Sequence, residues 1–184
     1  MYFPDLALCE YGFGPTDAKE WQVPLRAVGW LEHPHHYARG TLPSSVRTRL
    51  LRLRDQTQDA FWHHAYCGPH DCSLCKAASG RLTPLHLSAI NIFVPGNNCV
   101  YAAPGAIEHY FEAHTYWPPE EFCDAVLQCA DCGTPKYWEA LRRSNGGPVP
   151  LMHLVKLKER DEVPDMYLQK SNGDRFKVVL DHEF

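Results

Sequence analysis

The segment Cys72-Ser73-Leu74-Cys75 constrains this chain more than any other feature of its sequence. Two cysteines separated by two residues can place both thiolates on one tetrahedral metal ion, with each sulfur about 2.3 Å from the metal. The surrounding residues 67–76 are rich in Gly, Pro, His and Cys, a composition that disfavours regular structure and predicts a tight turn. The pattern therefore predicts a zinc knuckle in which Cys72 and Cys75 supply two of the ligands.

Two other interpretations of this CxxC stay open, namely buried thiols without metal and a redox-active pair. The redox interpretation is the weaker one, because no βαβ pattern surrounds the motif. The chain has eight cysteines, and residues 1–10 show no basic segment before an apolar stretch, so no secretory signal is expected. Thiols inside a cell stay reduced, which argues against a disulfide framework. We therefore expect a soluble, cytoplasmic protein with free or metal-bound thiols.

The segment His109-Tyr110-Phe111-Glu112-Ala113-His114 is expected to supply the other two ligands. Its HxxxxH spacing falls within the range that zinc proteins use, and a frayed last turn of helix can bring both rings to one side. The predicted metal ligands are Cys72, Cys75, His109 and His114.

Three other residues offer alternatives to this ligand set. His70 can act as a ligand or as a hydrogen-bond donor to a sulfur. Cys129 and Cys132 form a second CxxC that can complete an all-cysteine site, although it lies far along the chain from the first and its cysteines can also be small buried hydrophobes. A different group, His33, His35 and His36, is expected in a surface loop.

The rest of the sequence predicts an α+β fold of short strands and a hairpin, packed with about four helices around the zinc knuckle. Apolar runs predict strands at residues 25–31, 85–94 and 99–102, the last two joined by the turn residues 95–98. Helices are expected to begin near Pro43, Ala106, Pro119 and Pro135. The first helix has a buried stripe of Val46, Leu50 and Leu53, and we expect its arginines to form a solvated face. Those arginines are Arg47, Arg49, Arg52 and Arg54.

A Gly/Pro break near residue 147 divides the expected domains, 1–147 and 148–184. In the second, residues 151–158 predict a strand, and Asn172-Gly173 between two strand-like runs predicts a hairpin. We expect this small C-terminal β unit to pack on the first domain.

The bulk composition excludes several classes of protein. With 45% apolar and 22% charged residues, the chain resembles ordinary globular proteins. The net charge of −4 disfavours binding to a negatively charged phosphate backbone, so nucleic acid is not the expected partner. No segment approaches the roughly 20 apolar residues of a membrane span.

Several short blocks together resemble a family of small uncharacterised bacterial proteins. The blocks are an HxCxxC at residues 70–75, VPG and YAAP at residues 94–104, and HxxxxH followed by PPEEF at residues 109–122, with further likeness at residues 2–6 and 28–31. The resemblance spans residues 1–145 and maps the family's cysteine and histidine motifs onto His70, Cys72, Cys75, His109 and His114. It implies no particular activity, and the tail after Pro150 lies outside it.

A metal ion with four protein ligands has no open position for water or substrate, so we expect a structural zinc ion and a non-enzymatic protein. The leading hypothesis is a bacterial immunity or adaptor protein that binds another protein, such as a toxin or effector. Mild acidity and many aromatic residues motivate it, among them Trp21, Trp30, Trp62, Trp117 and Trp138.

Two alternatives remain. A zinc-dependent hydrolase would need an open metal position and a base such as Asp71, Glu108 or Glu112. The common hydrolase and nucleotide-binding motifs HExxH, GxSxG and GxxxxGK[ST] are absent from the sequence. A zinc-finger-like nucleic-acid binder would rely on the helix with Arg47 to Arg54 as its basic face.

Overall fold

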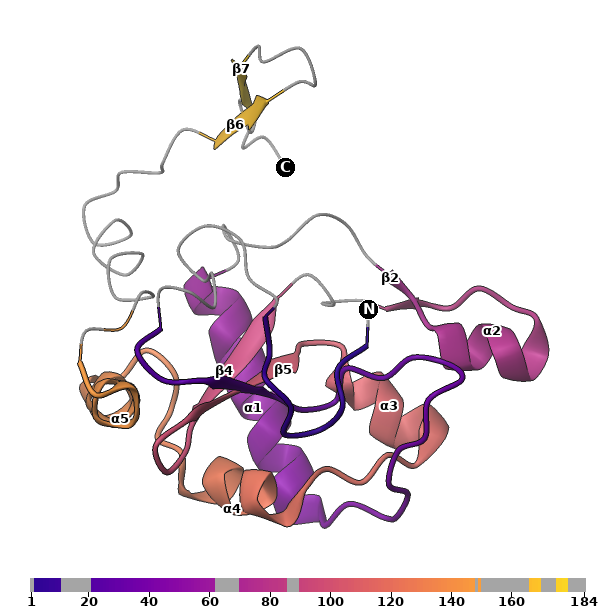
Figure 1. Ribbon diagram of the computed structural model, residues 1–184, viewed down its shortest axis with the longest axis horizontal. Coiled ribbons are helices and arrows are strands. Elements are labelled where there is room, and N and C mark those ends of the chain that lie inside the picture. Colours follow the sequence, from indigo (N-terminus) through magenta and orange to yellow (C-terminus); the bar gives the residue numbers. More distant parts are fainter. Residues whose placement is uncertain are drawn as a thin grey trace. The chain divides into compact units, whose positions relative to one another are not determined.

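The computed structural model describes residues 2–10, 21–61, 70–85, 90–147, 149, 166–169 and 175–178. The chain divides into two compact units, Met1–Met152 and His153–Phe184. Within the described ranges, the first unit combines five helices with short strands, so the fold is a mixed α+β fold (Figure 1). The predicted division after residue 147 and the packing of the tail on the first domain stay predictions.

A three-stranded sheet forms the centre of the first unit. Its order is β1 (Leu25–Ala27), β5 (Val100–Pro104) and β4 (Asn91–Pro95), with β5 parallel to β1 and antiparallel to β4. The predicted hairpin is therefore confirmed, and every residue of β5 is buried. β1 is shorter than the predicted strand because Gly29 adopts a φ of 75°, which a strand does not accommodate.

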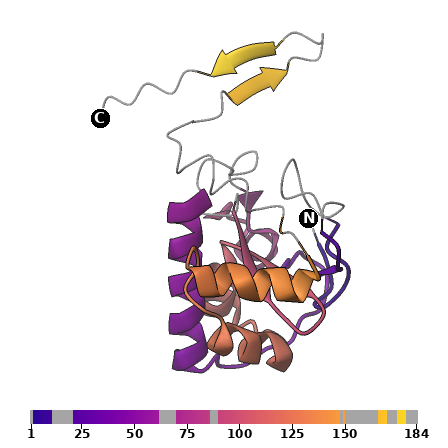
Figure 2. The ribbon, with the colours of Figure 1, turned by 90° about the vertical axis from the view of Figure 1, so that its left-hand side faces the viewer.

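Helix α1 (Ser44–Phe61) packs along the sheet through the predicted apolar stripe. Val46, Leu50 and Leu53 are all buried, and the helix contacts β4 and α4. Its start near Pro43 is confirmed. Figure 2 shows α4 and α5 running across the direction of α1.

The other three predicted helices are confirmed as α3 (Ile107–His114), α4 (Glu120–Gln128) and α5 (Pro135–Asn145). Thr134 begins α5 as its N-cap, since its hydroxyl oxygen accepts the backbone N–H of Tyr137 at 3.3 Å. Acidic residues occupy the first turn of α4, where the helix dipole favours them. A fifth helix, α2 (Ser73–Ser79), lies between the short strands β2 (His70–Asp71) and β3 (Pro84–Leu85).

Most of the tryptophans belong to the core. The side chains of Trp21, Trp30 and Trp138 are buried, and Trp117 is half-buried. Trp62 lies outside the described residues. The described tryptophans therefore contribute to folding and leave little aromatic surface for a partner.

The second unit contains one described hairpin, β6 (Met166–Gln169) paired antiparallel with β7 (Arg175–Val178). Both strands agree with the predicted pair. The predicted strand at residues 151–158 and the turn at Asn172-Gly173 lie outside the described residues. Across the described helices, none combines the length and apolarity needed to cross a membrane.

Candidate metal centre

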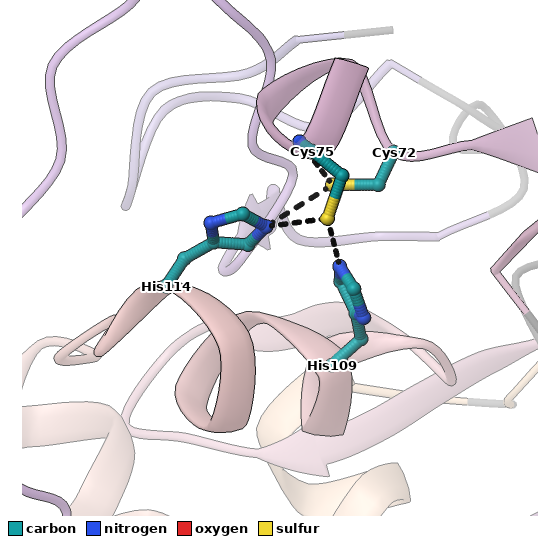
Figure 3. A group of neighbouring side chains, drawn as sticks. All are labelled: Cys72, Cys75, His109 and His114. Atoms are coloured by element: carbon teal, nitrogen blue, oxygen red, sulfur yellow. Dashed lines mark hydrogen bonds between the residues drawn. The ribbon is translucent and has the colours of Figure 1, made fainter. Parts of the chain in front are cut away.

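The CxxC occupies the start of α2, where the sequence predicts an irregular turn. Cys72 is the N-cap residue, and its sulfur accepts the backbone N–H of Cys75 at 3.4 Å. This cap satisfies a donor at the helix end, so α2 begins directly after β2 and Cys72. Cys75 lies one turn further along and projects to the same side as Cys72 (Figure 3). The prediction of an irregular turn is thus wrong for residues 73–76, which are helical, while residues 67–69 of the predicted turn lie outside the described residues.

Two short strands hold this helix in place. β2 pairs with β3 antiparallel, and the backbone N–H of Cys72 donates to the carbonyl of Thr83 at 2.8 Å. Gly80 ends α2 with a φ of 71°, which lets the chain turn back into β3. The hydroxyl of Ser73 accepts the backbone N–H of His33 at 3.0 Å, which attaches a second loop to the knuckle formed by β2, α2 and β3.

Helix α3 supplies the two histidines. Its buried face, formed by Ile107, Tyr110 and Phe111, packs into the protein. His114 is the last helical residue, and Thr115 follows in the left-handed conformation with a φ of 53°. In Figure 3 the rings of His109 and His114 both point toward the cysteines of α2.

The distances between the donor atoms match those expected around one ion. Nε2 of His114 lies 3.3 Å from the sulfurs of both Cys72 and Cys75, and Nε2 of His109 lies 3.3 Å from the sulfur of Cys75. All four donor atoms lie within 4.8 Å of one another. Sulfur and nitrogen bound to one tetrahedral zinc ion lie about 3.5 Å apart, given bonds of about 2.3 and 2.0 Å. The cluster can therefore hold a metal ion.

The electrostatics of the cluster suit a cation. Burial lowers the pKa of His109 and of His114, which keeps both imidazoles in the neutral form that binds metals. Burial also raises the pKa of the Cys72 thiol. A bound divalent cation opposes this effect, because its charge stabilises the thiolate.

Ion pairs between α1 and α3 fix the helix that carries the histidines. Arg54 pairs with Glu108, and Arg47 pairs with Glu112. Arg54 is mostly buried, with 14% of its side chain exposed. The prediction of a solvated arginine face is therefore wrong for Arg54, whose partner Glu108 comes from a helix far along the chain. Arg47 is 45% exposed, as predicted, although it also has an acidic partner. Complementary spacing is visible in the sequence, with arginines seven apart on α1 and glutamates four apart on α3.

The other two arginines of α1 pair with the loop after α4. Arg49 and Arg52 both bind the carboxylate of Asp131, and Arg49 also donates to the carbonyl of Cys129. All four arginines of α1 thus have acidic partners within the protein. These acidic partners offset the positive charge that a basic face for nucleic-acid binding would need.

The alternative ligands lie outside the cluster, within the described part of the chain. His70 is exposed on β2. The sulfur of Cys132 lies 3.7 Å from the hydroxyl of Thr57 on α1, and burial raises the pKa of Cys129 to about 12. Burial also raises the pKa of Cys132, which is half-buried, so the thiol form is favoured at both cysteines. The histidines His33, His35 and His36 are exposed, as expected.

Comparison with other proteins gives a family and no activity. No curated protein and no solved structure matches the chain. Residues 1–127 match the family described as domain of unknown function (DUF7919). This region contains β1 to β5, α1 to α3 and all four residues of the cluster, and an uncharacterised family agrees with the resemblance seen in the sequence. The chain belongs to the DUF7919 family.

Proposed function

We propose that Cys72, Cys75, His109 and His114 hold one structural Zn²⁺ ion, and that the protein acts by binding and not by catalysis. The observation that carries this proposal is the convergence of four donor atoms, from two separate helices, within 4.8 Å. Two thiolates and two imidazoles in tetrahedral arrangement are a ligand set that favours zinc. Two thiolates also neutralise the charge of the ion.

The ligand count supports a structural role for the ion. Four protein ligands fill the tetrahedral positions of zinc, whereas zinc hydrolases keep one position for water. No carboxylate of the described residues belongs to the cluster. Zinc-dependent hydrolysis is therefore the less favoured alternative.

Helix α2 buries little apolar surface of its own. It spans seven residues and buries only Leu74 among its own side chains. Helices this short are marginal without tertiary packing. An ion that joins α2 to α3 would supply that packing, so zinc binding and folding of the knuckle should be coupled.

Metal content of the untagged protein is the direct measurement. We expect one zinc ion per chain, lost in Cys75→Ser and in His114→Asn, and a lower Tm after chelation. Cys123→Ser and His35→Asn serve as matched controls, since both residues lie outside the cluster. Co²⁺ substituted for zinc should show the strong visible absorption of a tetrahedral thiolate site. Zinc retained by Cys75→Ser, or a Co²⁺ spectrum of higher coordination number, would contradict the proposal.

The partner we propose is another protein, with an immunity or adaptor role as one concrete form. Support comes from the fixed conformation that four ligands would impose on the knuckle, which presents Leu82 with 62% of its surface exposed. Loops held in one conformation lose less entropy when they bind.

Coexpression with the products of neighbouring genes examines this role. A specific partner should copurify with the wild-type protein, and Leu82→Asp should weaken the complex without loss of zinc. Thr48→Asp, at an exposed position on α1, is the control. Turnover of a peptide or nucleotide in the absence of any complex would argue for an enzyme instead.

A further inference from the structure

A cleft of about 960 Å³ lies between the β4–β5 turn and the helices α4 and α5. None of the four cluster residues lines it. Arg26 of β1 and Tyr101 of β5 are neighbours in register, so both side chains leave the same face of the sheet and reach this cleft. Its volume is at the upper end of the range for small-molecule sites, roughly 300 to 1,000 Å³.

Hydrogen bonds hold the walls of the cleft in position. The Ser144 hydroxyl of α5 donates to the carbonyl of Gly96 in the turn at 2.7 Å, and the Tyr101 hydroxyl donates to Glu121 of α4 at 3.1 Å. Gly96 leaves no space for a larger residue, because a Cβ there would lie 2.7 Å from the Tyr101 ring. The cleft is therefore preformed and would not need to order on binding.

Each helix contributes a small residue to the middle of its wall. Ala140 lies between Lys136 and Arg143 on one face of α5, and all three line the cleft. Ala125 occupies the corresponding place on α4. Longer side chains therefore flank an open centre on both walls.

The two walls carry opposite charges. α4 contributes Glu121 and Asp124, while α5 contributes Lys136. Within the described residues, Asp124, Lys136 and Arg26 form no ion pair. Arg26 does donate one hydrogen bond to the carbonyl of Leu6, at 3.1 Å. Charges of both signs are thus available to a ligand.

We propose that this cleft binds a small zwitterionic ligand of the amino-acid or short-peptide class. Its amine or guanidinium group would face Glu121 and Asp124, and its carboxylate would face Lys136 and Arg26. The charged side chains in the lining disfavour a purely apolar ligand, because they would be buried without partners. The proposal is independent of the metal ion, since the cleft and the cluster share no residue.

The dipeptide arginyl-glutamate, which carries both charges, is a suitable probe for the full-length protein. Calorimetry and NMR titration should detect saturable binding, whereas N-acetylarginine amide and N-acetylglutamate amide, each with one charge, should bind at least about fivefold more weakly. The same dipeptide with both termini capped distinguishes two sources of the ligand. Unchanged affinity indicates a segment of a peptide chain, and lost affinity indicates a molecule with free termini.

Substitutions in the walls of the cleft test whether the dipeptide binds there. Asp124→Asn and Lys136→Gln should each weaken binding about fivefold, as expected for a partly exposed ion pair. Ala140→Leu should weaken it by filling the centre, with no change of charge. Asp55→Asn and Arg142→Gln remove the same kinds of charge outside the cleft and should have no effect.

Three results would overturn the proposal. The first is no saturable binding up to about 10 mM dipeptide, a concentration at which even a very weak site would be occupied. The second is equal affinity for the dipeptide and the singly charged probes. The third is an affinity that none of the three cleft variants changes. Thermal unfolding of each variant shows that it is folded before titration.

Discussion

A single oxygen of Asp5 joins two distant parts of the chain. Oδ1 accepts the backbone N–H of Gly29 at 2.9 Å and the hydroxyl of Tyr116 at 2.7 Å. Burial raises the pKa of Asp5 above its ordinary value of 3.8, although these two hydrogen bonds oppose the shift. The folded protein therefore holds the Asp5 proton more tightly than the unfolded chain does.

This raised pKa predicts a pH-dependent difference between the wild type and Asp5→Asn. The stability contributed by protonated Asp5 is complete below pH 3.8 and is lost as the pH rises through the raised folded value. The amide that replaces the carboxyl in this variant has an oxygen that can accept the same two hydrogen bonds, and it does not ionise. Urea unfolding between pH 4 and 7, with zinc in excess, should show the variant gaining stability relative to the wild type as the pH rises.

Asp5→Ala is the companion variant, because it removes the acceptor as well as the charge. It should be about 2 to 3 kcal/mol less stable than Asp5→Asn at every pH, because neither variant ionises at this position and Ala leaves the two donors without an acceptor. If Asp5→Asn and the wild type keep a constant difference across this range, Asp5 does not titrate as described.

Two glycines with positive φ predict a contrast in stability. Gly29 has a φ of 75°, and a Cβ there would lie 2.7 Å from Cδ1 of Ile107. Gly80 has a φ of 71°, with no atom within 4 Å of such a Cβ. Gly80→Ala should cost about 1 to 2 kcal/mol from backbone strain, and Gly29→Ala about 2 to 5 kcal/mol from strain and crowding. Equal losses in the free energy of unfolding, measured with denaturant, would show that a Cβ at Gly29 does not crowd Ile107.

At the scale of elements, the packing of α3 on α1 sets where the histidines lie. Arg54→Gln should lower the free energy of unfolding by about 1 to 3 kcal/mol, because it leaves the Glu108 carboxylate without its largely buried partner. Zinc affinity, measured against a chromophoric chelator, should fall as well. Arg52→Gln should change stability by less than about 1 kcal/mol, since Arg52 is 60% exposed and Asp131 keeps Arg49. Equal zinc affinity in both variants would show that metal binding does not depend on the packing of α3 on α1.

Local sequence signals predict the helices and strands more accurately than they predict the contacts between them. The helical spacing before His114, the hairpin turn and Thr134-Pro135 each specify structure within a few residues, and each agrees with the structure. Helix α2 escapes prediction because the Gly and Pro residues before it favour a turn, while the capping sulfur of Cys72 is a less familiar helix start. The partners of Arg47 and Arg54 depend on how distant helices pack, which spacing along one helix does not specify.

The extent of the first unit exceeds that of the family match. The match ends at residue 127, yet Tyr137 and Leu141 of α5 are buried, and the Tyr137 hydroxyl donates to the carbonyl of Phe93 at 2.8 Å. The core therefore includes α5. The end of this helix is readable from the sequence, because Gly146 follows it in the left-handed conformation that glycine adopts most readily.

Truncated chains test whether the folded unit ends at residue 127, where the family match ends, or includes α5. A chain ending at residue 152, the end of the first compact unit, should stay folded, bind one zinc ion and unfold cooperatively. A chain ending at residue 127 should lose cooperative unfolding, because it exposes the apolar surface that α5 covers. Circular dichroism and metal content distinguish the outcomes. A folded, zinc-bound chain ending at residue 127 would show that α5 is dispensable.

The hydrogen-bonded contact between Cys75 and His109 spans 34 positions along the chain, and β3, β4 and β5 all lie between them. With the proposed ion bound, this stretch becomes a closed ring. A covalent cross-link that closes a ring of this size stabilises a protein by about 4 kcal/mol, because it lowers the entropy of the unfolded chain. The proposed cross-link is a single exchangeable ion, so removing the ion would open the ring around the central hairpin without breaking any covalent bond of the chain.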